Sequence, residues 1–237
     1  MLHRDIAGSP ELILLFVSCE KLKDRWFRID QTCQRLGVSS YFIVSGGHKK
    51  TAFDESNNRL LLDCEDTYEA LPCKVLMMLR ETHLRYPDAV LWKIDDDVEL
   101  MIDTHSVQGL THQILTLALG RANSFIAPLT VKRPASSPRA ADWAVGRCSA
   151  DSLWNTTPYL GECPSEWANG GHTYIIGPAA LNLLSKTREN PKLHVLEDLM
   201  VSLIIEHESK KEIKVKELRS LRPLIATDIY DRGVHHN

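Results

Sequence analysis

The 237-residue sequence lacks the features that identify membrane proteins, nucleic-acid-binding proteins and secreted precursors. Its longest apolar run near the N-terminus is Leu12–Val17, far short of the roughly 20 residues that a bilayer-spanning helix needs. Glu11 directly before that run also argues against a signal peptide. The formal net charge of −3 gives no basic footprint for nucleic acid. We therefore expect a chain that is cytoplasmic as given, with no transmembrane segment and no nucleic-acid partner.

The sequence also lacks the cysteine spacing of a zinc ribbon, the cysteine density of a disulfide scaffold and the motif of a phosphate-binding loop. No two cysteines have CxxC spacing, and no GxxxxGK[ST] loop occurs. We expect reduced, mostly buried thiols, although Cys148 and Cys163 flank a loop and could pair in an oxidising compartment. The six cysteines are Cys19, Cys33, Cys64, Cys73, Cys148 and Cys163.

Apolar periodicity predicts strands that alternate with helices, which is typical of an α/β fold with a mainly parallel central sheet flanked by helices. Residues 130–170 have little periodicity and several prolines, so we expect a long loop there that is either functional or disordered. The expected strands are Glu11–Cys19, Ser40–Val44, Arg59–Cys64, Ala89–Ile94, Val98–Ile102, Ser124–Leu129, His172–Ile176 and Glu212–Val215. The expected helices are Lys21–Leu36, Leu71–Tyr86, Ser106–Leu119, Pro178–Thr187 and Glu197–Glu206.

Three consecutive carboxylates, Asp95, Asp96 and Asp97, follow an apolar strand. Ligands bind beyond the carboxyl ends of strands in such sheets. Side chains alternate along extended chain, so Asp95 and Asp97 should face one way and Asp96 the other. Oxygen ligands on one side suit Mg²⁺ or Mn²⁺. The alternative is a solvated acidic turn without a ligand.

Four segments in order resemble the β-1,3-galactosyltransferase-like family, which includes fringe and the β-1,3-N-acetylglucosaminyltransferases. They are Asp66–Lys74, Trp92–Val98, Gly170–Gly177 and Leu196–Val201, and Ile29–Cys33 is similar to a fifth family stretch. The resemblance implies a GT-A fold over residues 1–237 as one domain. Its donor-binding half would be about 1–105 and its acceptor and catalytic half about 106–237.

The family resemblance implies a metal-dependent inverting glycosyltransferase that uses Mn²⁺ or Mg²⁺. It would move a hexose or N-acetylhexosamine from a UDP-sugar to a hydroxyl of a glycan or glycoprotein, giving a β-linked product. The chain could then be the soluble catalytic domain of a longer or membrane-associated protein. Two other hypotheses stay open: a non-catalytic nucleotide-sugar- or glycan-binding module, and a metal-dependent nucleotidyl or phosphoryl transferase.

The resemblance also implies which residues bind the metal and the sugar donor. Asp97 would be the direct metal ligand with Asp95 beside it, and a C-terminal histidine would be the third, His236 rather than His235. Lys74 would brace the segment of Asp66. The expected donor-binding residues are Asp96, Asp66, Arg28 and Lys93, of which Arg28 is our own expectation from its place in the sequence.

Asp198 would be the catalytic base by the same resemblance. It opens a predicted helix, whose N-terminus favours an ionised carboxylate, and the alternative is a simple first-turn carboxylate. Trp167 could stack on a sugar or pack under the loop. The expected acceptor-binding residues are Trp167, Gly170, Gly171 and Glu197. His172 could be catalytic, but because it is a strand residue we expect it to be a core histidine.

Overall fold

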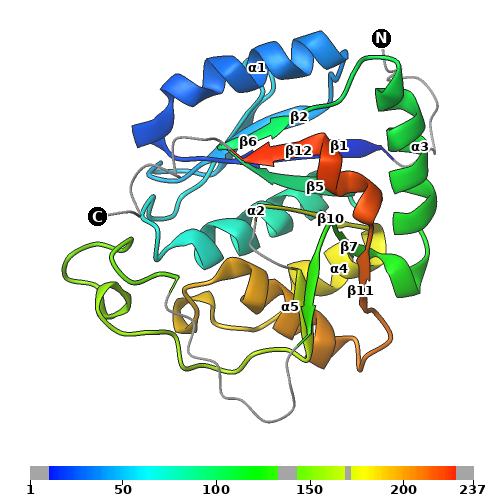
Figure 1. The fold of residues 1–237 in the computed structure, drawn as a ribbon. Helices are drawn as coiled ribbons and strands as arrows, with labels where there is room; N and C mark the ends of the chain where they lie inside the picture. The colour runs from blue at the N-terminus through cyan, green and yellow to red at the C-terminus, as the bar shows by residue number, and fades with distance from the viewer. Residues whose placement is uncertain (1–10, 133–142, 169–171, 228–237) are drawn as a thin grey trace.

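A computed structural model describes residues 11–132, 143–168 and 172–227 of the chain. A central sheet of eight strands lies between two layers of helices (Figure 1). The strand order across this sheet is β11-β7-β10-β5-β1-β2-β4-β3, and two small sheets pair β12 with β6 and β8 with β9. The expected α/β fold with a mainly parallel sheet flanked by helices is therefore confirmed.

The strands and helices have the following bounds. The strands are β1 (Leu12–Val17), β2 (Tyr41–Ser45), β3 (Ala52–Asp54), β4 (Arg59–Leu61), β5 (Val90–Asp95), β6 (Val98–Leu100), β7 (Phe125–Ala127), β8 (Thr130–Lys132), β9 (Glu166–Ala168), β10 (Thr173–Ile176), β11 (Val215–Glu217) and β12 (Ile225–Thr227). The α-helices are α1 (Asp24–Leu36), α2 (Leu71–Arg85), α3 (Ser106–Ala118), α4 (Pro178–Lys186) and α5 (Glu197–Glu208).

Strand directions decide which strand ends meet. β1 pairs in parallel with β2 and β5, and β2 pairs in parallel with β4. The carboxyl ends of these strands therefore lie along one edge of the sheet. β10 runs antiparallel between β5 and β7, so its amino-terminal end reaches the edge where β5 ends.

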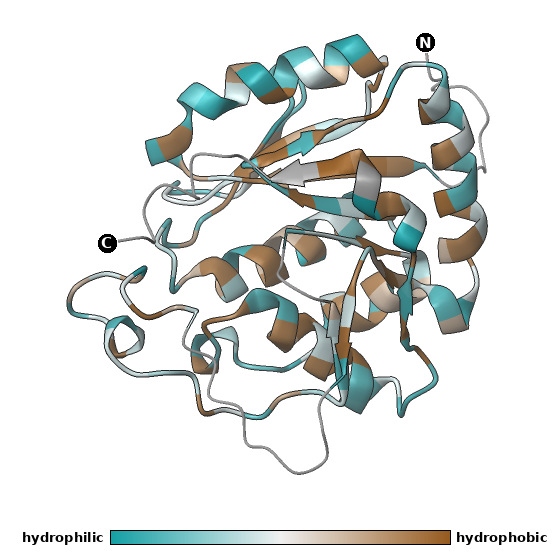
Figure 2. Ribbon diagram, in the orientation of Figure 1, coloured by the Kyte–Doolittle hydropathy of each residue, from teal (hydrophilic) through white to brown (hydrophobic). Residues whose placement is uncertain are grey.

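The two faces of the sheet carry separate apolar cores, because side chains alternate along each strand. Helices α2, α4 and α5 cover one face, on which Leu15 and Leu91 lie, and α1 and α3 cover the other, with Phe16 and Trp92. The buried strands and the inner sides of the helices are mainly hydrophobic, and polar residues gather on the outer sides (Figure 2).

Local sequence signals explain the helix ends. Gly37 adopts the left-handed conformation, with φ 67°, and its amide donates to the carbonyls of Cys33 and Gln34 at the end of α1. Pro72 lies in the first turn of α2, and Pro178 lies in the first turn of α4. At Gly177, an added Cβ would lie 2.0 Å from the carbonyl oxygen of Ala118, so glycine lets α3 and α4 approach closely.

Four short strands were not expected from the sequence: β3, β8, β9 and β12. Each has three residues, too few for an alternating pattern to be recognised. The pair of β8 and β9 lies in the region for which we expected a loop. None of the helices in the described part of the chain has the length and apolar content that a bilayer-spanning segment requires. The division into donor and acceptor halves stays a prediction.

Candidate functional site

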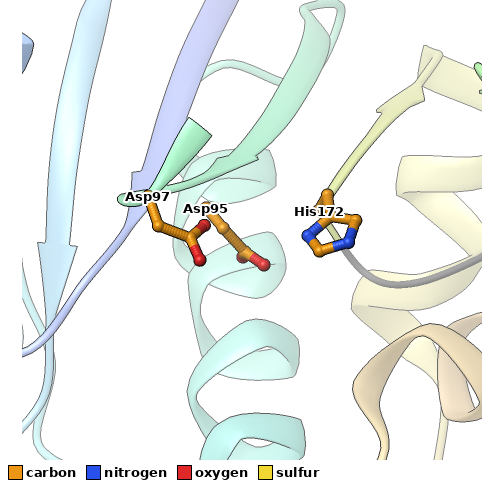
Figure 3. Close-up of side chains that lie close together, drawn as sticks. All are labelled: Asp95, Asp97 and His172. Atoms are coloured by element: carbon orange, nitrogen blue, oxygen red, sulfur yellow. The ribbon is translucent and has the colours of Figure 1, made fainter. Parts of the chain in front are cut away.

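The acidic triplet follows β5 at the edge of the sheet, and the antiparallel neighbour β10 brings His172 across from it. Thr173 pairs with Ile94, so the residue before Thr173 lies opposite the residue after Ile94. The amide of Asp95 donates accordingly to the carbonyl of His172 at 2.9 Å. One potential ligand atom from each of Asp95, Asp97 and His172 lies within 4.8 Å of the others (Figure 3).

These three side chains fit a divalent cation. Oδ1 of Asp97 is buried and has no hydrogen-bond partner among the described residues, which is costly for a carboxylate oxygen unless a ligand meets it. Two carboxylates and one imidazole form a ligand set suited to a hard or borderline cation such as Mn²⁺. The expected third ligand, His236, and its neighbour His235 lie outside the described residues.

His172 is therefore not the core histidine that the sequence suggested. It is half-buried and turned toward the two carboxylates (Figure 3). Residue type alone could not reveal this, because His172 reaches the triplet through the antiparallel pairing of β10 with β5.

Behind the triplet, Lys93 lies between two acids. Its Nζ is 2.5 Å from Oδ1 of Asp95 and 2.7 Å from Oε1 of Glu197. Burial, with Glu197 nearby, raises the pKa of Asp95 to about 7 despite Lys93. Burial likewise raises the pKa of Glu197 to about 7, with a smaller contribution from Asp198. Burial opposes the charge of Lys93, but the two acids together raise its pKa above the ordinary value, so Lys93 is a cation.

The charges of this group do not cancel. With Asp95, Asp97 and Glu197 ionised, one ammonium leaves a formal charge of −2. A divalent cation beside the triplet would neutralise it and favour the ionised carboxylates.

Lys93 and Glu197 depart from the roles expected for them. Their side chains are only 1% and 3% exposed. Donor and acceptor molecules approach from solvent, so residues this buried are badly placed to bind either one directly. Lys93 lies on the face of the sheet that α5 covers, as Leu91 does, and this explains why it meets Glu197.

Asp198 lies next to Glu197 in the first turn of α5. Its Oδ1 accepts a hydrogen bond from the amide of Leu199 at 2.9 Å, and the helix N-terminus favours its ionised form. Lys93 contacts both Asp95 and Glu197, the residue directly before Asp198, so the first turn of α5 lies beside the triplet.

Asp96 faces away from the triad, as the alternation predicts. Its Oδ2 accepts from the hydroxyl of Ser18, and its Oδ1 pairs with Arg25, both at 2.6 Å. Arg28 donates to the backbone carbonyl of Asp96 at 3.3 Å, so this cation lies beside the triplet. Donor contacts of Asp96 and Arg28 stay predictions, and the Asp96 carboxylate already ties β5 to β1 and α1.

The carboxylate of Asp66 forms hydrogen bonds with the loops that follow β1 and β2. It accepts from the amides of Glu20 and Gly46 at 2.8 and 2.9 Å and pairs with Lys74 at 2.5 Å. Burial alone would raise the pKa of Asp66, but Lys74 and these amides hold it below the ordinary value. The expected brace between Lys74 and Asp66 is present. Whether Asp66 also meets a nucleotide stays a prediction.

The expected acceptor residues are only partly described. Gly170 and Gly171 lie outside the described residues. Trp167 is half-buried in β9 and packs against a small apolar cluster that includes Tyr159, Val195 and Leu199. It therefore has the packing role that we considered beside the sugar contact, and its remaining exposure keeps the sugar contact as a prediction.

Comparisons with known proteins identify one family. A family model described as Galactosyltransferase matches residues 20–218. No curated protein matches the chain by sequence.

Among solved structures, one described as a glucose-1-phosphate thymidylyltransferase from Bacillus anthracis, in complex with a sucrose, has 9% identity and a TM-score of 0.36, covering 89% of this chain and 87% of its own. A 4-diphosphocytidyl-2C-methyl-D-erythritol synthase has 15% identity and a TM-score of 0.36, covering 81% of this chain and 87% of its own. Scores this low add nothing to the description of the fold given by the sheet and helices themselves.

Proposed function

The chain belongs to the galactosyltransferase family, and from this premise we propose that it is a metal-dependent, inverting enzyme that uses a UDP-sugar. Membership makes it a glycosyltransferase; the metal, the donor and the acceptor are the proposed part. The sugar moved would be a hexose or N-acetylhexosamine, and the acceptor a hydroxyl of a glycan or glycoprotein. The observation that carries the proposal is the triad of Asp95, Asp97 and His172 beside the helix turn that carries Asp198.

Asp95, Asp97 and His172 would hold Mn²⁺ or Mg²⁺, which would supply positive charge beside the diphosphate of the donor. Lys93 already occupies Oδ1 of Asp95, so Oδ2 is the oxygen that we expect to face the cation. His172 would contribute a ring nitrogen, for which it must be neutral.

Asp198 would act as the general base. Its carboxylate takes the proton of the acceptor hydroxyl while the hydroxyl oxygen forms a bond to the anomeric carbon. The bond from that carbon to the UDP oxygen breaks, and UDP leaves with the electron pair. Attack from the side opposite UDP inverts the anomeric carbon.

A thermal-shift screen of nucleotide sugars, with and without Mn²⁺, tests the binding step. A ligand that binds only the folded state stabilises it, by about 2.7 kcal/mol at a concentration of 100 times the Kd. We expect one or more UDP-sugars to raise the Tm when Mn²⁺ is present and to do much less without it. A chain that no nucleotide sugar stabilises under either condition would contradict the proposal.

Replacing the base tests the transfer step. Asp198→Asn should lower the rate of transfer by about 10² to 10⁴-fold and preserve the Tm shift caused by the donor. The control is Asp88→Asn, which changes an exposed carboxylate in the turn before β5, at the opposite end of that strand from Asp95. Transfer at the control rate in Asp198→Asn would remove Asp198 from the mechanism.

A further inference from the structure

Two charged side chains beside the site lie in the core rather than at its surface. Lys93 belongs to β5 and Glu197 to α5, 104 residues apart in the sequence, and the Nζ–Oε1 distance between them is 2.7 Å. Their side chains are 1% and 3% exposed. Burying a cation and an anion costs several kcal/mol for each ion, so such a pair adds little to stability compared with apolar side chains of the same size.

The neighbours of this ion pair in the sequence are the residues of the proposed chemistry. Lys93 precedes Asp95 by two positions in β5 and donates to its Oδ1 at 2.5 Å. Glu197 directly precedes Asp198 in the first turn of α5. One ammonium group therefore connects the strand end that carries two triad residues to the helix turn that carries the base.

The ammonium group is itself held in place. Tyr174 lies opposite Lys93 in the pairing of β10 with β5, and Nζ of Lys93 is 5.3 Å from the centre of its ring. The ring is buried and packs against Phe125 edge to face. Lys93 thus contacts Asp95 of its own strand, Glu197 of α5 and the ring of Tyr174 in β10.

We propose that Lys93 and Glu197 are a positioning pair that aligns the cation site with the catalytic base. Lys93 fixes the Asp95 carboxylate so that its second oxygen faces the cation. Through Glu197, Lys93 also fixes the first turn of α5 and with it the direction of Asp198. The inference rests on the proposed function, because it requires a cation at Asp95 and a base at Asp198.

A double variant separates positioning from simple stabilisation. Lys93→Met together with Glu197→Leu replaces the buried ion pair by apolar side chains of similar size, and such replacements are often neutral or stabilising. Asp95 loses the same ammonium group, but its side chain is 28% exposed and keeps contact with solvent. We expect the double variant to fold, to bind Mn²⁺ about 10- to 100-fold more weakly than the wild type, and to lose a similar factor in kcat. Mn²⁺ binding is measured without substrates, from the electron paramagnetic resonance signal of the free ion.

A single variant tests the two halves of the pair separately. Glu197→Gln removes the negative charge, so the charge-assisted hydrogen bond that ties Lys93 to α5 is replaced by a weaker one to a neutral carbonyl oxygen. Lys93 still donates to Asp95. We expect its Mn²⁺ affinity to stay within about twofold of the wild type and its kcat at saturating Mn²⁺ and donor to fall about tenfold. A residue that only stabilised the fold would change neither value in the folded protein.

The control is Arg80→Met, which removes a half-buried cation of α2 that donates to the carbonyl of Thr187 at 2.8 Å and contacts none of the proposed site residues in the described hydrogen bonds. A folded double variant with the Mn²⁺ affinity and kcat of this control overturns the inference. Where the double variant does not fold, an unchanged kcat in Glu197→Gln overturns it, and the expected tenfold fall supports it. If wild-type protein neither binds Mn²⁺ nor transfers sugar, the proposed function fails and the inference fails with it. If the wild type does both and the variants match the control, the inference alone fails.

Discussion

Protons should compete with the cation at Asp95, so the affinity for Mn²⁺ should fall as the pH falls. A protonated carboxyl group cannot serve as the ligand, and burial raises the pKa of Asp95 to about 7. The carboxylate is then about 90% ionised at pH 8 and about 3% ionised at pH 5.5. The apparent affinity should therefore be about 30-fold weaker at pH 5.5, a difference of about 2 kcal/mol in binding free energy.

The assay is a titration with Mn²⁺ at several pH values between 5.5 and 8, in which the electron paramagnetic resonance signal measures the concentration of free Mn²⁺. A His172→Gln background removes the imidazole from the titration and leaves the carboxylates. Asp95→Asn in the same background should bind more weakly at every pH and lose most of the dependence. An affinity in the His172→Gln protein that is equal at pH 5.5 and pH 8, or stronger at pH 5.5, would refute the reasoning.

Two further predictions concern the frame of the site. Lys74→Met leaves the Asp66 carboxylate without its buried cation. It should therefore lower the free energy of unfolding, measured by urea titration, by about 3–5 kcal/mol. A loss below about 1 kcal/mol would show that the pair is dispensable. Gly177→Ala places a Cβ 2.0 Å from the carbonyl oxygen of Ala118. It should lower the free energy of unfolding by at least about 1–3 kcal/mol in the same titration. Wild-type stability in this variant would show that α3 and α4 can move apart at little cost.

Regular features of the sequence predicted the main sheet and the side-chain directions of the triplet. β5 is long enough for its apolar run to be recognised, and period-2 alternation correctly separated Asp96, which faces Arg25, from Asp95. Strand–helix alternation was sufficient to place Asp95 at the carboxyl end of a parallel strand, the edge at which ligands generally bind in such sheets.

The sequence could not predict the parts of the site that depend on contacts between segments far apart in the chain. His172 joins the triad only because β10 runs antiparallel beside β5, whereas βα alternation favours parallel neighbours. Lys93 and Glu197 are charged, and charged residues are rarely buried, so their positions near the motifs suggested ligand contacts. Their burial depends on how α5 packs over β5, which no local pattern encodes.

The most direct test of the account is an analysis of the nucleotide product formed from a UDP-sugar and a glycan acceptor. We predict one molecule of UDP for each glycoside formed, in a reaction that stops when the divalent cation is chelated and that Asp97→Ala abolishes. Release of UMP and pyrophosphate, or glycoside formation at an undiminished rate in the presence of the chelator, would contradict the central claim.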